Sequence, residues 1–223
     1  MSRRALTAFA AVFAAGLAAL VITAQLERKS EAFTLGVLPS AGIERLVQGD
    51  ELCQRPIDVI DSFDRVKLQL GTFARPGSPF VLEVRAGDAG RGSVRARVAG
   101  GYRDNMVHTV TLPRAVPEGS SVAVCVRNAG SRPIAPYGNS GASNPTSAAY
   151  ENGRPLDSDM TLVFLREEPA TVLSLVPSIV ERASLFHGDW GSRPAYWVLL
   201  VLLLVGPASL VALAARAAFR DET

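Results

Sequence analysis

The chain begins and ends with a long run of apolar residues, and polar sequence fills the interval between them. The first run covers residues 5–24 and the second covers residues 195–215, and neither contains a charged side chain. A helix of about 20 apolar residues matches the thickness of a bilayer's hydrocarbon core. The pattern therefore predicts two transmembrane helices with one polar region between them.

Arginines flank both apolar runs on the sides away from the central region, Arg3 with Arg4 at one end and Arg216 with Arg220 at the other. Positively charged flanks stay in the cytoplasm during membrane insertion. Both termini are therefore predicted to be cytoplasmic, in a plasma membrane, with the centre of the chain extracytoplasmic.

Aromatic residues gather where the second run begins, at Trp190, Tyr196 and Trp197. Such rings favour the headgroup level, which predicts that they lie at the membrane interface. The alternative for the first run is a cleaved signal peptide ending at Ala24. Against it, Ile22 is not a small residue and the run exceeds a usual signal core. Either alternative exports the central region.

Between the two runs, apolar and polar residues alternate in short segments of strand length. These segments lie at residues 66–70, 80–84, 94–98, 106–112, 122–126 and 160–165. Turn sequences such as Arg75-Pro76-Gly77 and Asn128-Ala129-Gly130 separate them. Period-two alternation with frequent turns predicts a mainly β fold, an antiparallel β-sandwich. The number of strands that fit the length favours a jelly-roll order.

The period changes after the last predicted strand. Apolar residues in 170–187 recur at intervals of three and four, which predicts an amphipathic helix just outside the membrane, with Pro177 as a candidate break. We therefore divide the chain into an N-terminal anchor, a sandwich, a juxtamembrane helix with linker, a transmembrane helix and a tail. Their predicted bounds are residues 1–25, 26–168, 169–193, 194–216 and 217–223.

Two cysteines, Cys53 and Cys125, both lie in the central region. An even number of cysteines in an oxidising compartment predicts one disulfide. Two buried free thiols are the alternative. A metal site is disfavoured because no histidine or third cysteine lies at ligand spacing. No cofactor is predicted.

A long segment rich in glycine, proline, serine and asparagine covers residues 129–156 and is predicted to be a loop. Its Tyr137, Asn139 and Tyr150 are candidates to stack on and hydrogen-bond a sugar. A solvated loop without a ligand is the alternative.

Tyr102, Asp104 and Asn105 form a second candidate ligand edge, although these residue types also build turns without any ligand. The aspartates Asp58, Asp61 and Asp64 are spaced by three and could bind calcium, but the regular calcium-loop pattern is missing and a solvated turn is favoured.

Catalytic motifs are absent from the sequence. No serine has the Gly-x-Ser-x-Gly context of a hydrolase elbow, and no glycine-rich phosphate loop precedes a helix. The two histidines, His108 and His187, are far apart in the chain, and His108 lies in a predicted strand whose apolar positions are Val107 and Val110. A net charge of +2 argues against a nucleic-acid partner.

Several stretches resemble a group of poorly characterised two-pass envelope proteins of high-GC bacteria. The stretches are residues 51–53, Phe63 with 68–72, 124–130 and 182–186. The resemblance implies an association with a membrane glycosyltransferase or another multi-pass protein. The sandwich portion is similar, more loosely, to carbohydrate-binding jelly rolls, which implies an envelope glycan as ligand.

These observations support a non-enzymatic membrane-anchored envelope protein. Its sandwich would bind glycan or serve as an accessory subunit of a membrane enzyme that handles glycan. One alternative is a structural subunit that assembles through its helices, because Ala11, Ala15 and Ala19 form a small-residue face. The other is a hydrolase of envelope polysaccharide, which needs two facing carboxylates.

Overall fold

The computed structural model describes residues 3–86, 92–139, 147–185 and 193–218. The chain divides into two compact units, one made of Met1–Lys29 with Ala170–Thr223 and the other of Ser30–Pro169. The first unit contains the helices, and the second contains nearly all of the strand residues.

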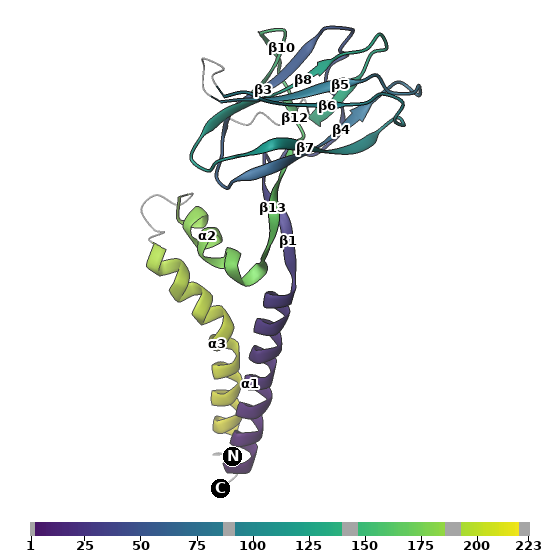
Figure 1. The fold of residues 1–223 in the computed structure, drawn as a ribbon. Coiled ribbons are helices and arrows are strands. Elements are labelled where there is room, and N and C mark those ends of the chain that lie inside the picture. The colour runs from purple at the N-terminus through teal and green to yellow at the C-terminus, as the bar shows by residue number, and fades with distance from the viewer. Residues whose placement is uncertain (1–2, 87–91, 140–146, 186–192, 219–223) are drawn as a thin grey trace. The chain divides into compact units, whose positions relative to one another are not determined.

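The Ser30–Pro169 unit is built from two antiparallel sheets (Figure 1). The seven-stranded sheet contains β1 (Arg28–Thr34), β2 (Ala41–Gly42), β4 (Phe63–Gly71), β7 (Met106–Val116), β9 (Ala135–Asn139), β12 (Asp159–Met160) and β13 (Val163–Thr171). The six-stranded sheet contains β3 (Glu51–Asp58), β5 (Phe80–Ala86), β6 (Val94–Val98), β8 (Ser121–Asn128), β10 (Ala148–Glu151) and β11 (Arg154–Pro155). The expected antiparallel β-sandwich is confirmed.

The long strands form nested antiparallel pairs that alternate between the sheets. The innermost pair is β5 with β6, followed outward by β4 with β7, β3 with β8, and β1 with β13. Their order is β1-β13-β4 with β7 on the other side of β4 in one sheet, and β3-β8-β5-β6 in the other. This arrangement of a long hairpin rolled across two layers is a jelly roll, as the sequence pattern predicts.

Period-two alternation explains why these segments become strands. In β8 the side chains of Val122, Val124 and Val126 are buried, and β5 buries Phe80, Leu82 and Val84 on the same face of the sheet. Burying one side of each strand fixes the register, because a slip of one residue would turn every core side chain toward solvent.

An aromatic cluster fills the core beneath the outermost strands. Phe33 of β1 stacks on Phe164 of β13 with ring centroids 4.3 Å apart, and Phe63 of β4 meets Phe164 edge-on at 4.7 Å. All three rings are buried. They join the first and last strands of the sandwich, so the two ends of this unit's sequence are held in one layer.

The prediction of one long loop over residues 129–156 is wrong. Within it, β9 pairs with the end of β4, and β10 pairs with β3 along its whole length. Ile134 and Ala149 are completely buried. These short strands contain glycines and prolines and show no alternation of apolar and polar residues. Each strand contributes only one or two side chains to the core, so the sequence pattern does not predict it.

The alternating pattern also predicts no strand before residue 66, yet β1, β3 and the first residues of β4 lie there. Most residues of β1 are charged or polar, and its two buried residues, Ala32 and Phe33, are adjacent, so β1 shows no alternating pattern. In β3 the buried residues include Gln54, a polar side chain whose amide is satisfied by Ser147 and Asp159. Buried polar residues with partners therefore interrupt the pattern without breaking the strand.

The helical unit contains α1 (Arg3–Leu26), α2 (Val172–Leu185) and α3 (Arg193–Ala218). Thr7–Leu26 and Pro194–Leu213 are long and apolar enough to cross a membrane, and their side chains are not buried by protein. The helix expected over 170–187 is present as α2, and it continues through Pro177 instead of breaking there. Pro177 is the sixth residue of α2, past the first turn, so the helix continues there with one backbone donor fewer.

Candidate functional site

Four connecting segments converge at one end of the sandwich. Gly77 donates a backbone hydrogen bond to Tyr102 at 2.9 Å, Ala129 donates one to Pro79 at 2.9 Å, and Leu46 exchanges backbone bonds with Ile134. The segments before β3, after β4, after β6 and after β8 are therefore joined into one surface. Loop ends held by a rigid sandwich are the usual place for binding residues.

This surface contains a pocket of about 290 Å³ lined by Arg45, Phe73, Arg75 and Pro133. The volume is close to the lower limit for small-molecule sites, about 300 Å³. Phe73 is 51% exposed although phenylalanine is usually buried. An exposed aromatic ring and a proline beside two guanidinium groups give the pocket an apolar wall and a cationic rim.

The backbone at Phe73 is held in an uncommon conformation. Phe73 and the next residue, Ala74, both have a φ of +57°, a region that bulky side chains rarely adopt. Such conformations persist only where the surroundings enforce them, and they cluster at functional sites. Here they turn the Phe73 ring outward at the end of β4 rather than into the core.

Asp104 supplies the hydrogen bonds that enforce this turn. Its carboxylate accepts from the backbone N–H groups of Thr72 and Ala74 and from that of Asn105, the last two at 2.8 and 3.0 Å. The bonds from Thr72 and Ala74 hold the pKa of the Asp104 carboxyl below its usual value. An ionised Asp104 therefore clamps the turn that carries Phe73.

The two arginines of the pocket have no ion-pair partner within the described part of the chain. The Arg45 guanidinium lies 5.6 Å from the centroid of the Phe73 ring, a cation–π contact. The nearby Glu44 carboxylate accepts from the backbone N–H of Arg45 at 2.9 Å rather than from its guanidinium. Both guanidinium groups are therefore available to a bound anion.

Three of the predicted ligand residues meet beside this pocket. Asp104 and Asn105 lie on the segment before β7, and the Tyr137 hydroxyl donates to the Asn105 side-chain oxygen at 2.6 Å. The ring of Tyr137 also packs against Gly71, where an added Cβ would approach it to 3.2 Å. These three residues support the wall of the pocket from behind the Phe73 turn.

The other predicted ligand residues lie elsewhere. Tyr102 is buried against Gly77, and burial raises its pKa to about 12. Asn139 pairs with Asp159 across β9 and β12. Tyr150 lies on β10 in the six-stranded sheet, with the Arg55 guanidinium 4.3 Å above its ring. Sequence reasoning missed Phe73 and its two arginines, although an aromatic residue two positions before the Arg75-Pro76-Gly77 turn was a usable signal.

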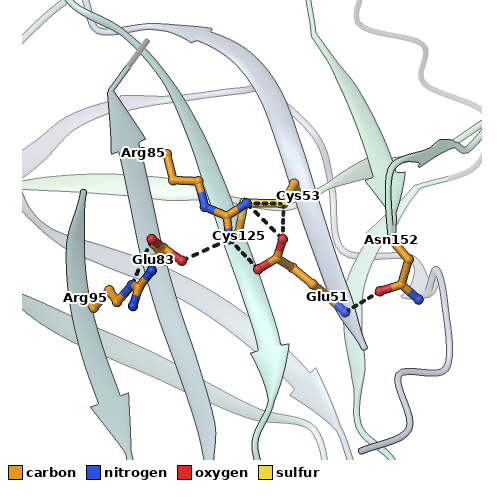
Figure 2. Close-up of polar contacts among 7 residues, drawn as sticks. All are labelled: Glu51, Cys53, Glu83, Arg85, Arg95, Cys125 and Asn152. Carbon is orange, nitrogen blue, oxygen red and sulfur yellow. Dashed lines mark hydrogen bonds and ion pairs between the residues drawn. A yellow bond between two sulfur atoms is a disulfide. The ribbon is translucent and has the colours of Figure 1, made fainter. Parts of the chain in front are cut away.

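A second polar cluster surrounds the cysteines on the six-stranded sheet (Figure 2). Cys53 of β3 lies directly opposite Cys125 of β8, and the two form the expected disulfide. Beside it, the Asn152 side chain accepts from the backbone N–H of Glu51 at 3.0 Å. Both sulfur atoms are largely hidden from solvent.

Arg85 is the centre of the charges in this cluster (Figure 2). Its guanidinium binds both carboxylate oxygens of Glu51, at 2.5 and 2.9 Å, and one oxygen of Glu83 at 2.9 Å. The other Glu83 oxygen pairs with Arg95 at 2.8 Å. Burial opposes ionisation of Glu83, but the bonds from Arg85 and Arg95 outweigh it and lower its pKa.

Glu51, Cys53 and Cys125 form the one group of potential metal-ligand atoms that lie within 4.8 Å of each other in the described part of the chain. The sulfur atoms are bonded to each other and the carboxylate is neutralised by Arg85. Metal ions need free thiolates and carboxylates, so this cluster is a structural one.

His108 turns into the core, and Val107, predicted as an apolar position of this strand, turns outward. Val107 is 46% exposed, whereas His108 is buried between Tyr102 and Phe80, with ring centroids at 4.4 and 5.3 Å. The inward register belongs to His108, Val110 and Leu112, so Val107 is not an apolar core position. Desolvation lowers the pKa of His108.

The aspartates considered for calcium are not gathered into a site. Asp61 pairs with Arg166 at 2.5 Å, Asp64 pairs with Arg65 at 3.2 Å, and Asp58 ends β3. Of the residues predicted for the membrane interface, Tyr196 is half-buried and Trp197 is exposed on α3. Trp190 and His187 lie outside the described residues.

A scan against protein-family models finds no family that matches this chain, and a search of curated proteins finds no relative.

Proposed function

We propose that this chain is a membrane-anchored, non-catalytic binding protein whose sandwich lies outside the cytoplasm and binds envelope glycan. The observation that carries the proposal is the Phe73 pocket, an exposed aromatic ring fixed by Asp104 at the loop end of a jelly roll. The C–H face of a sugar ring packs on an exposed aromatic ring of this kind.

The proposed location is supported by three features of the chain. The two helices of membrane-spanning length leave their apolar side chains uncovered by protein. The Cys53–Cys125 disulfide fits an oxidising compartment. The arginines outside each apolar run favour cytoplasmic termini.

The topology can be tested on the full-length protein with a tag at each end. Protease added to cells whose outer layers have been removed should digest the sandwich and leave both terminal tags intact. Loss of the tags with an undigested sandwich would reverse the proposed orientation.

The binding function can be tested by presenting purified full-length protein in detergent to a panel of envelope glycans. Phe73→Ala should lower the affinity for a bound glycan by about tenfold or more, the loss typical of an anchoring aromatic contact. Tyr150→Ala removes the candidate aromatic residue of the six-stranded sheet and should leave binding unchanged. The reverse result would move the site to the face of the six-stranded sheet, and no binding to any glycan would refute the function.

The same pocket is compatible with an accessory role beside a membrane enzyme that handles glycan. A mild-detergent pull-down of the tagged protein from its own membranes separates the two roles. Stoichiometric recovery of a multi-pass transferase would favour the accessory role, and recovery of the protein alone would favour an autonomous glycan-binding protein.

A further inference from the structure

We infer that the Phe73 pocket selects an anionic sugar, one that carries a carboxylate or a phosphate group, over its neutral counterpart. This inference rests on the proposed glycan-binding function and names the class of ligand for the same site. It follows from the two arginines of the pocket, from its shape, and from the nearby carboxylates, which accept from backbone N–H groups instead of from these guanidinium groups.

Neither arginine of the pocket is bound by a carboxylate. Arg45 and Arg75 are both exposed and have no ion-pair partner among the described residues. Other exposed arginines, such as Arg97, also lack one, so the pocket is distinguished by two such arginines that line it together with an aromatic ring. An anion in the pocket would be attracted by both charges. The planar donor fork of arginine also suits carboxylate and phosphate oxygens better than a neutral hydroxyl.

The nearby carboxylates do not occupy this anion site. Asp104 accepts from backbone N–H groups of the Phe73 turn, and those bonds, which lower its pKa, engage its oxygens with the main chain and not with either arginine. Glu44 accepts from the main chain of Arg45. The two pocket guanidinium groups therefore keep their donors free.

The shape of the pocket limits the ligand to a small unit. A volume of about 290 Å³ accommodates little more than one sugar ring with its substituent. Phe73 and Pro133 provide apolar surface for the ring, while Arg45 and Arg75 approach the charged group. A simple anion would use only the arginines, and a neutral sugar would use only the apolar wall.

The inference is tested with four named probes on the full-length protein in detergent micelles: glucose, glucuronate, glucose 6-phosphate and inorganic phosphate. Glucuronate, glucose 6-phosphate or both should bind at least about tenfold more tightly than glucose, and added salt should weaken them. Whichever probe binds identifies the anionic group. Inorganic phosphate should bind more weakly than a sugar phosphate, because it lacks the ring.

The matched variants are Arg45→Gln, Arg75→Gln and Arg97→Gln, the last an exposed arginine of β6 outside the pocket. Each pocket variant should lower affinity for the anionic sugar by about tenfold while affinity for glucose stays the same. Arg97→Gln should change neither. Arg75→Lys should retain part of the preference, since a lysine keeps the charge but not the two-pronged donor.

The outcomes separate the two proposals. Equal binding of glucose, glucuronate and glucose 6-phosphate that is lost in Phe73→Ala would overturn the anionic preference and leave the glycan function standing. Inorganic phosphate binding as tightly as glucose 6-phosphate would overturn both, because the ring would contribute nothing. The absence of binding by all four probes would also overturn the anionic preference at this site.

Discussion

Arginines serve opposite purposes in two regions of this sandwich. In the cluster around the disulfide, Arg85 forms ion pairs with Glu51 and Glu83, so carboxylates of the protein itself balance its charge (Figure 2). In the pocket, Arg45 and Arg75 face an exposed phenylalanine and bind no carboxylate among the described residues. The ion pair of Arg85 with Glu51 links β5 to β3, whereas the two unpaired arginines of the pocket line a cavity beside an aromatic ring, where we propose that a ligand binds.

The comparison also predicts which substitutions lower the free energy of unfolding and which lower the affinity for a ligand. The ion pairs of this cluster link strands β3, β5 and β6, so their loss should destabilise the sandwich. Pocket residues project from segments that the backbone already fixes, so their loss should leave the fold intact.

The largest effect is expected from removing the disulfide. Its cysteines are 72 residues apart, and closing such a loop stabilises a protein by about 4 kcal/mol in the chain-entropy treatment. The Cys53→Ser, Cys125→Ser double variant should lose roughly that much free energy of unfolding. Denaturant titration of the full-length protein, followed by its strand circular dichroism signal, measures it. A loss below about 1 kcal/mol would show that this region does not carry the stability assigned to it.

A smaller effect is expected when the saturated charges are broken. Glu83→Gln leaves Arg95 without its carboxylate and removes one of the two partners of Arg85, which should cost about 1–2 kcal/mol. Glu118→Gln is the control, because Glu118 is exposed in the turn before β8 and should stay within about 0.5 kcal/mol of the parent. If both variants lose the same stability, the cluster has no special role.

Acidification should weaken the sandwich in two separate pH ranges. The pKa of His108 is lowered from 6.5 on folding, so its contribution is complete above pH 6.5 and is lost as pH falls below that value. The pKa of Glu83 is lowered from 4.5, so its contribution disappears only below pH 4.5. His108→Phe should remove the first loss and keep the second. A pH–stability curve with an unchanged upper range in this variant would argue against a buried neutral histidine.

The smallest effect on stability is expected in the pocket. Arg45→Gln and Arg75→Gln should each keep the free energy of unfolding within about 0.5 kcal/mol of the parent, because neither guanidinium has an ion pair within the part of the chain that the structure describes. The same titration measures this. A loss as large as that of Glu83→Gln would mean that these arginines hold the fold and would remove the contrast between the two regions.

The sequence predicted more of the fold than of the site. Strands such as β5 and β8 were predictable because their core-facing valine, leucine and phenylalanine side chains recur at every second position. The strands hidden in residues 129–156 were not, since β9 and β10 bury few side chains and are stabilised by pairing with β4 and β3. Pairing with distant strands leaves no local pattern in the sequence.

The candidate site was predicted only in part for a similar reason. Asp104, Asn105 and Tyr137 stood out as polar or aromatic residues among turn sequences, and the structure places them together. Phe73 and Arg45 looked like an ordinary apolar residue and an ordinary surface charge. Their meeting depends on the Asp104 bonds that turn Phe73 outward, and no spacing in the chain encodes that contact.

The sequence by itself determined the two apolar helices, the mainly β centre, its jelly-roll class and the cysteine pair. Each of these depends on a local period, or on counting residues in a compartment. Only the tertiary structure decided which arginines are paired, which way His108 faces, and that Phe73 borders a pocket. Those outcomes depend on contacts between residues of strands and loops that are far apart in the chain. The local pattern of apolar and polar residues carries no information about such long-range contacts.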